Sequence, residues 1–279
     1  MINILSLCDN IVDDKKCWAA EGVSFSISID NIRILFDTGR SIDVLLHNLS
    51  EKSIDIKEFD YIVLSHGHKG HMGAMEFLLP HLNPSTVIVF GKGLDNQKYK
   101  VVEGKKNFGS GAKNSEIVKK IKMQQQYMEI SATVELTENI TLLADVPLLS
   151  NHLATFSNKY MVINENTFAD IDLFVEEISL CIRCDHFLII VSGCSHRGID
   201  NIVSYAKSLY PERELYGIFG GFHTKDDETK TELLITYLNE VPLKVIAPCH
   251  CTGIYSKSKI KSSFPEIYQD LTTGKSLKI

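Results

Sequence analysis

The segment Ser65-His66-Gly67-His68-Lys69-Gly70-His71 places three histidines within six residues, directly after the apolar run Tyr61–Leu64. A short apolar run of this kind is typical of a buried β-strand. A loop at the end of such a strand can turn three imidazoles toward one point, and imidazole is a common ligand of zinc-like cations. The pattern therefore predicts a metal site at a strand end, with a polar surface turn that carries incidental histidines as the alternative.

The second half of the chain alternates strand and helix patterns. Three strand-like runs are separated by two predicted helices. Apolar residues recur at helical spacing over 199–209, and the second helix is predicted at 226–239. Ligand sites of α/β folds form at strand ends, so a histidine at such a place is a candidate site residue. Each run ends at a loop with one such histidine: 187–191 before His196, 215–219 before His223, and 244–247 before His250.

The first third of the chain should begin with a hairpin, because apolar and small residues alternate over 23–29 and Asp30-Asn31 can turn the chain into 32–36. Helices are expected at 42–49 and at 72–79, where the second stops before Pro80. The chain has no short-period repeat, low-complexity tract or proline-rich linker. We therefore expect one compact α/β domain over residues 1–279.

Residues 91–122 differ from the rest in charge. This segment contains nine lysines and three acidic residues, which gives a local charge of +6. The remainder of the chain therefore carries a charge of −12. Five glycines predict little regular structure. The segment is either a solvated insertion or a mobile lid, and in the second case Lys105 and Lys106 would attract an anionic substrate.

Composition limits the class of protein. The chain has 279 residues, of which 44% are hydrophobic, and this suffices for a substantial core. A net charge of −6 argues against binding to nucleic acid or an anionic membrane, and no apolar run approaches the length of a bilayer span. Seven cysteines and the absence of a secretory pattern predict a reducing, cytoplasmic setting. A homo-oligomer is compatible with all of this.

Five short motifs, taken in order, resemble one branch of the metallo-β-lactamase-fold proteins, the branch grouped with the archaeal 7,8-dihydropterin-6-methyl-4-(β-D-ribofuranosyl)aminobenzene-5′-phosphate synthase. The resemblance runs from about Asn3 to the C-terminus. The motifs are Leu35-Phe36-Asp37-Thr38-Gly39, Ser65-His66-Gly67-His68, Gly193-Cys194-Ser195-His196-Arg197-Gly198-Ile199, Gly220-Gly221-Phe222-His223 and Pro248-Cys249-His250-Cys251-Thr252-Gly253.

The resemblance implies an αβ/βα four-layer sandwich, in which two mixed β-sheets are flanked by helices and the metal lies at one edge. It implies that Asp37 orients ligand histidines. Gly70 stands where the family motif has an Asp, and Lys69 cannot replace that ligand because an ammonium group only donates hydrogen bonds. A second metal ion is therefore expected to bind weakly. The implied metal ligands are His66, His68, His71, His196 and His250.

Other candidates are weaker. Cys194 follows a strand where many family members place a metal-bridging Asp, but small buried cysteines are common. Cys249 and Cys251 flank His250, and at most one face of an extended segment can point inward with it. A zinc or redox role for Cys181 and Cys184 is a minor alternative. Substrate binding or proton transfer is expected of His223, Lys69, Lys105 and Lys106, with structural packing as the alternative for His223. Surface positions are expected of His47, His81, His152 and His186, and His152 is the candidate to replace a ligand lost elsewhere.

The leading hypothesis is a metal-dependent hydrolase or transferase that acts on a small, anionic substrate, phosphorylated or pterin-like. Its cation would acidify a bound water toward neutral pH. Zinc is the preferred ion, one or two per chain, with manganese and iron as alternatives. The competing hypothesis is a catalytically degenerate member of the fold that binds a ligand or partner, and nuclease activity is a weaker third.

Overall fold

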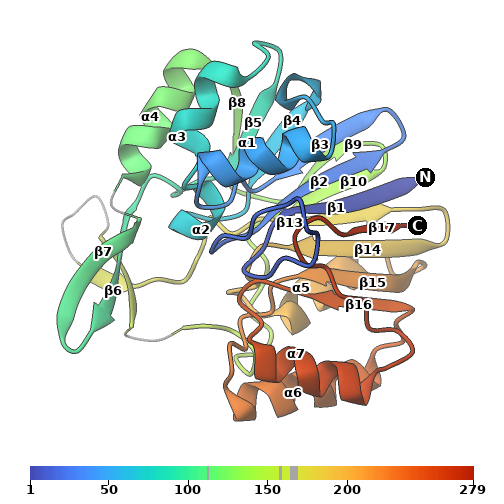
Figure 1. Cartoon of the computed structure of the whole chain (residues 1–279). Helices are drawn as coiled ribbons and strands as arrows, with labels where there is room; N and C mark the ends of the chain where they lie inside the picture. The colour runs from blue at the N-terminus through green and yellow to red at the C-terminus, as the bar shows by residue number, and fades with distance from the viewer. Residues whose placement is uncertain (112, 157–158, 164–168) are drawn as a thin grey trace. The chain divides into compact units, whose positions relative to one another are not determined.

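The computed structural model of the chain describes residues 1–111, 113–156, 159–163 and 169–279, and its elements divide between two units (Figure 1). Each unit has its own sheet, helices and hydrophobic core. The behaviour of residues 1–279 as one domain stays a prediction. Unit 1 comprises Met1–Ile130, Phe156–Glu176 and Thr272–Ile279, and unit 2 comprises Ser131–Thr155 and Glu177–Leu271.

The main sheet of unit 1 is mixed, with the strand order β17-β1-β2-β3-β4-β5-β8. The predicted hairpin is confirmed, since β2 and β3 pair antiparallel with Ile29 opposite Ile32. Strands β3, β4, β5 and β8 are parallel, so the carboxyl ends of β3 and β4 lie at the same edge. The strands are β1 (Ile2–Cys8), β2 (Ser24–Ile29), β3 (Ile32–Phe36), β4 (Tyr61–Leu64), β5 (Val87–Gly91), β8 (Gln126–Ile130) and β17 (Ser276–Lys278).

The helices of unit 1 cover one face of this sheet (Figure 1). The single helix predicted at 72–79 is wrong: the chain forms two short helices and a 3-10 turn. The break has a physical cause, because the amide of Ala74 donates to the carbonyl of Gly39 at 3.2 Å and so leaves the helical ladder. The helices are α1 (Ile42–Glu51), η1 (Ile56–Glu58), α2 (Lys69–Met72), α3 (Met75–Leu78), η2 (Leu79–His81) and α4 (Asn114–Gln124).

Unit 1 also contains a four-stranded sheet in the order β12-β11-β6-β7. The expectation of little regular structure over 91–122 is therefore wrong, since β6, β7 and α4 lie in that segment; residue 112 lies outside the described residues. Strand β6 pairs with β11, some sixty positions later, and that pairing is invisible to local composition. The strands are β6 (Gln97–Val102), β7 (Lys105–Gly111), β11 (Tyr160–Ile163) and β12 (Ala169–Ile171).

Unit 2 has a second mixed sheet in the order β16-β15-β14-β13-β10-β9, with α6 and α7 side by side (Figure 1). Strands β14, β15 and β16 are parallel, so the loops with His196, His223 and His250 leave the same edge. Two mixed sheets with helices are thus confirmed. The elements are β9 (Val134–Thr137), β10 (Ile140–Leu143), β13 (Ser179–Arg183), β14 (Phe187–Ser192), β15 (Glu214–Gly220), β16 (Val245–Pro248), α5 (Ile199–Leu209), α6 (Glu228–Glu240) and α7 (Ile254–Ser263).

Among the described residues, no helix combines the length and the apolar character needed to cross a membrane.

Candidate metal centre

Asp37 is fully buried and begins the loop after β3. Its amide donates to the carbonyl of Val63 on the neighbouring strand at 2.8 Å. One carboxylate oxygen accepts the amide of Ser65 at 2.7 Å, and the other accepts the Ser65 hydroxyl at 2.7 Å and lies 2.6 Å from Nδ1 of His71. The carboxylate therefore fixes the ring of His71, which leaves Nε2 as the nitrogen that can bind a cation.

The hydroxyl of Ser65 links the first and last histidines of the motif. Its Oγ lies 2.9 Å from Nδ1 of His66 and 3.3 Å from Nδ1 of His71. Each ring thus has one nitrogen engaged by the Asp37–Ser65 pair. Since a metal-bound imidazole needs its other nitrogen held, this network has the form of a support for two ligands.

The separation of His66 and His68 fits a shared cation. Nε2 of His66 lies 3.1 Å from Nδ1 of His68. Two imidazoles that bind one tetrahedral zinc ion at about 2.0–2.1 Å have ligand nitrogens about 3.3 Å apart. His66 is fully buried and His68 half-buried, so a cation held between them would keep one side accessible.

The residues between these histidines offer no further ligand oxygen. Lys69 is exposed and Gly70 half-exposed. The carbonyl of Gly70 accepts the amide of Val23 at 3.1 Å, and Gly22 is glycine by necessity, since a Cβ there would lie 2.1 Å from that carbonyl oxygen. The carbonyl oxygen of Gly70 is therefore occupied by a hydrogen bond and by close packing against Gly22.

In unit 2, the loop after β14 is held by a buried carboxylate. Glu177 accepts the amide of His196 at 2.7 Å and the amide of Arg197 at 2.9 Å. The hydroxyl of Ser195 donates to the carbonyl of Gly221 in the next loop at 2.7 Å. These bonds fix the backbone on which His196, itself fully buried, is presented.

A second group of soft ligands lies in the same unit. Cys194, His223 and Cys251 each offer one ligand atom, and these atoms lie within 4.8 Å of one another. The amide of His223 donates to Sγ of Cys251 at 3.3 Å, and the rings of His196 and His223 are 4.2 Å apart between centroids. Thiolate and imidazole together suit zinc, so this group can contribute ligands to a metal centre.

His250 follows β16 and is half-exposed, while its neighbour Cys249 is buried. Four candidate residues, one in unit 1 and three in unit 2, have the left-handed backbone that non-glycine residues rarely adopt: Asp37 (φ 59°), Ser195 (φ 56°), His223 (φ 47°) and His250 (φ 47°). Such residues concentrate at functional sites, because the surrounding structure must compensate for the strain.

A buried ion cluster supports the histidine loop of unit 1. Nζ of Lys98 lies 2.5 Å from Asp172 and 2.8 Å from Glu176, and all three side chains are almost fully buried. Burial alone lowers the pKa of Lys98, but the carboxylates of Glu176 and Asp172 outweigh it and raise that pKa. Glu176 also accepts the amide of Gly67 at 3.3 Å, so the cluster contacts the loop directly.

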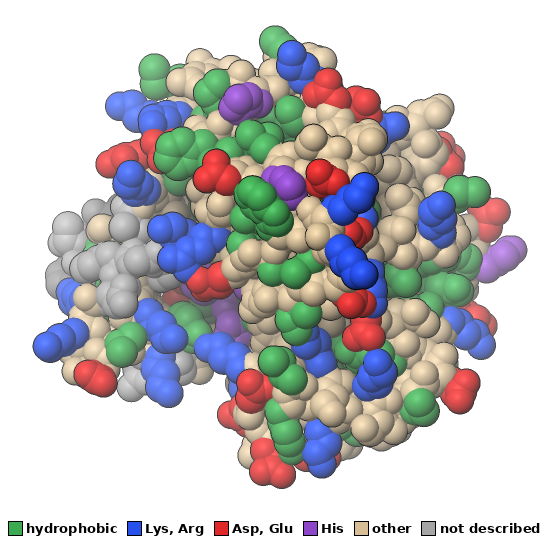
Figure 2. All heavy atoms as spheres, viewed as in Figure 1, with side chains coloured by type: hydrophobic (Ala, Val, Ile, Leu, Met, Phe, Trp, Pro, Cys, Tyr) green, Lys and Arg blue, Asp and Glu red, His purple; other side chains and the backbone are tan. Residues whose placement is uncertain are grey.

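The lysine-rich segment therefore packs beside the histidine loop within unit 1. Asn114, which begins α4, donates to the carbonyl of Gly67 at 2.8 Å. Lys105 and Lys106 are exposed on β7, and Nζ of Lys106 lies 5.1 Å from the ring of Tyr99. Figure 2 shows Lys and Arg side chains at the surface over β6 and β7. That Lys105 and Lys106 attract a substrate stays a prediction.

The remaining histidines and cysteines are mostly where the sequence indicated. His81, His152 and His186 are exposed. His47 is half-buried instead, because its ring stacks on Trp18 at 3.8 Å between centroids. Burial raises the pKa of the Cys181 thiol to about 12, which disfavours a thiolate there and so disfavours the Cys181–Cys184 hypothesis.

Sequence reasoning missed the supporting residues: Ser65, Glu177 and the Lys98 cluster. The one available signal was the pair Glu176-Glu177 directly before the apolar run 178–182, since two consecutive acids beside a buried strand need partners.

The chain is similar to several known proteins. The family model of the metallo-β-lactamase superfamily matches residues 21–94. The chain is 28% identical over 270 residues to 7,8-dihydropterin-6-methyl-4-(beta-D-ribofuranosyl)-aminobenzene-5'-phosphate synthase of Methanocaldococcus jannaschii, a match that covers 94% of this chain and 90% of the synthase.

Two solved structures extend the comparison. Tm1679, a metal-dependent hydrolase of the β-lactamase superfamily, is similar with 28% identity and a TM-score of 0.83, over 100% of this chain and 99% of that one. Zn(2+)-bound PqqB from Methylobacterium extorquens, 8% identical with a TM-score of 0.59 over 99% of this chain and 100% of that one, shares the fold alone.

Proposed function

Because this chain belongs to the metallo-β-lactamase superfamily, we propose that it is a metal-dependent hydrolase or transferase that acts on a small, phosphorylated or pterin-like substrate. The similarity to a synthase over most of both chains supports the pterin-like class, and the similarity to Tm1679 supports hydrolysis. The chemistry of the residues supports a metal in either case.

The proposed ligands of a first ion are His66, His68 and His196. His71, His250 and Cys194 are the proposed ligands of a second ion. Imidazole and thiolate favour zinc, and manganese or iron are the alternatives if oxygen ligands from a substrate complete the centre. When bound, such a cation supplies a Lewis acid and acidifies a water molecule.

One observation carries this proposal: the buried network in which Asp37 and Ser65 engage one nitrogen each of His66 and His71. A buried carboxylate beside two imidazoles is costly unless it has a task, and orienting metal ligands is the task that this geometry fits.

The other residues have roles that follow from their positions. His223 lies beside His196 and can hold or move a proton near the reacting atoms. Lys69 is exposed next to His68 and would attract the anionic group of a substrate, and the exposed Lys105 and Lys106 would add to that field. We propose that the protein has no nucleic-acid or membrane partner. We also propose a cytoplasmic location, which is consistent with seven free cysteines, and a homo-oligomer of unspecified size.

Gly70 favours a second candidate, a metal-fold protein that binds a ligand or partner without turnover. An Asp is missing where the family motif has one, so the second ion loses an anionic ligand. The two candidates differ in one measurable property, because only the enzyme converts a substrate.

Metal content tests the ligand set. Protein purified without added metal, and after loading with zinc, is analysed by mass spectrometry for ions per chain. We expect at least one ion per chain in the parent protein, and loss of that ion in the doubly substituted His66→Ala/His68→Ala variant. His186→Ala, an exposed histidine, is the control and should keep the parent stoichiometry.

Turnover is then measured with p-nitrophenyl phosphate and bis(p-nitrophenyl) phosphate, in the presence of zinc, manganese or iron. Hydrolysis that is lost in His66→Ala/His68→Ala and retained in His186→Ala supports the enzyme. Stoichiometric metal without conversion of either ester, and without coupling of a 7,8-dihydropterin that carries a leaving group on its 6-methyl carbon to the amine of 4-(β-D-ribofuranosyl)aminobenzene 5′-phosphate, supports the binding protein. A parent chain that binds no metal contradicts the enzyme and favours the catalytically degenerate member of the fold.

A further inference from the structure

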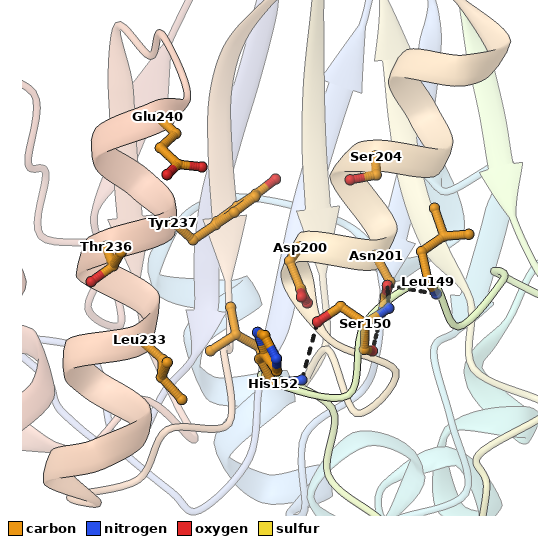
Figure 3. Close-up of a pocket in the computed structure, with 11 residues that line it drawn as sticks. Leu149, Ser150, His152, Asp200, Asn201, Ser204, Leu233, Thr236, Tyr237 and Glu240 are labelled. Atoms are coloured by element: carbon orange, nitrogen blue, oxygen red, sulfur yellow. Dashed lines mark hydrogen bonds between the residues drawn. The ribbon is translucent and has the colours of Figure 1, made fainter.

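Unit 2 contains a cavity of about 390 Å³ that no step of the proposed function uses. It lies between α5, α6 and the loop 149–153, and Figure 3 shows its lining. Asp200 comes from α5, Tyr237 and Glu240 come from α6, and leucines from the loop and α6 complete the wall. A concave site with few polar groups among apolar side chains is typical of a small-molecule pocket.

The carboxylate of Asp200 is the unusual group in this cavity. Its residue is only 8% exposed, and Oδ1 is buried without a hydrogen-bond partner among the described residues. A buried carboxylate oxygen without a partner is costly, and it is rare in folded proteins unless a ligand, ion or water satisfies it. Figure 3 shows the side chain pointing into the space between α5 and the loop.

Apart from the imidazole of His152, the side chains of the lining that can carry a charge are acidic or phenolic. No Lys or Arg is among the described residues that line the cavity, whereas Glu240 adds a second carboxylate at its exposed side. Burial, and after it the charge of Asp200, raises the pKa of Tyr237, so its phenol stays neutral. The cavity therefore favours a cation over an anion or a neutral molecule.

The wall beside Asp200 is held in place. The side chain of Asn201 accepts the amides of Leu149 and Ser150 at 3.0 and 2.9 Å, and donates to the carbonyls of Ser150 and Arg197 at 2.7 Å each. Three of these bonds tie the loop to α5. A cavity fixed in this way needs little ordering when a ligand binds, and this favours affinity.

The apolar part of the lining selects among cations. Leu149, Leu153, Leu233 and the ring of Tyr237 line the cavity beside the two carboxylates. A hydrated divalent ion needs several oxygen ligands, and the leucines supply none. An organic cation with a short apolar chain satisfies both parts, since its charge can pair with Asp200 while its carbons contact the leucines.

We propose that this cavity binds a small organic ammonium ion, with its charged nitrogen at Asp200 and its alkyl part against Leu149, Leu153 and Leu233. The site goes beyond the proposed function, because it involves none of the proposed metal ligands.

The probe is n-butylammonium chloride, titrated into the metal-loaded protein and followed by NMR chemical shifts of the protein amides. We expect saturable binding of one ion per chain, with shifts in α5, α6 and the loop 149–153. Asp200→Asn should weaken binding at least tenfold, and Asp185→Asn, an exposed carboxylate elsewhere in unit 2, should leave it unchanged. The neutral analogue 1-butanol should bind at least tenfold more weakly.

A second variant keeps the test decisive if Asp200→Asn fails to fold. Leu233 is 38% exposed, and Leu233→Lys places an ammonium group at the cavity that should compete with the probe. Shifts that do not saturate, equal affinity for 1-butanol, or unchanged affinity in both Asp200→Asn and Leu233→Lys overturn the proposal.

Discussion

Single residues of the candidate centre fall into two kinds, those that offer ligand atoms and those that hold them. Asp37 and Ser65 are of the second kind, because their bonds occupy one nitrogen on each of two imidazoles. Gly70 has no side chain, whereas the Asp of the family motif would place a carboxylate directly before His71. A substitution at this residue isolates the contribution of a single carboxylate.

Gly70→Asp should increase the affinity for a second metal ion, because it adds an anionic oxygen ligand beside His71. We expect the second equivalent to bind at least tenfold more tightly, which corresponds to about 1.4 kcal/mol. Competition with a chromophoric chelator measures both binding steps.

Gly104→Asp is the matched control for this change. Gly104 lies in the turn between β6 and β7, where an added Cβ would have no heavy atom within 4 Å, and Asp tolerates its left-handed backbone. It should leave both metal affinities unchanged. If Gly70→Asp gives no gain, the second site differs from the family pattern by more than this residue.

Elements of the fold were predictable where the pattern was local. The strands that end at histidine loops, and the helices α1 and α5, follow from periodicity in short windows. The β6–β7 hairpin was not predictable, because it depends on distant parts of the chain. Strand β6 pairs with β11, and the buried Lys98 forms its ion pairs with acidic residues more than seventy positions later. The glycine content of this segment indicated a loop, but the pairing of β6 with a distant strand stabilises a sheet there instead.

Lys98→Met should destabilise the protein, because it leaves the buried carboxylates of Asp172 and Glu176 without their cation. Removing one partner of a buried ion pair costs about 3–5 kcal/mol. Urea denaturation followed by circular dichroism measures the change in the free energy of unfolding.

Lys105→Met removes the same charge from an exposed position of the adjacent strand, and should change stability by less than about 0.5 kcal/mol. Equal effects of the two substitutions would show that the Lys98 cluster contributes no more than a surface charge.

For the whole molecule, the sequence indicated candidate ligands in both halves and the supporting Asp37, but not Ser65, Glu177 or the Lys98 cluster. Histidines at strand ends are visible in the sequence because the strand precedes them directly. The partners of Glu177 and Asp37 are backbone amides and hydroxyls in other loops, so their roles depend on the folded chain. The proposed ion should stabilise the folded chain, and this can be measured.

Chelation should lower the thermal unfolding midpoint of the metal-loaded protein. A ligand present at one hundred times its Kd stabilises by about 2.7 kcal/mol, which corresponds to roughly 5 °C for a chain of this size. Scanning calorimetry with and without a chelator measures the difference.

His66→Ala in unit 1 and His196→Ala in unit 2 should each remove the chelator-dependent part of the midpoint, while His186→Ala keeps it. A full chelator effect in His196→Ala would instead assign the ion to unit 1 alone.

The left-handed backbone at Ser195, His223 and His250 affects how this chain would respond to directed evolution for thermal stability. Glycine adopts that backbone without steric conflict, so a library ranked by thermal tolerance will enrich glycine at these codons. Each such exchange would relieve on the order of 1 kcal/mol of strain. The most heat-tolerant descendants of such a library would then have lost the imidazoles of His223 and His250 and the hydroxyl of Ser195, so these three codons should be kept constant during any such selection.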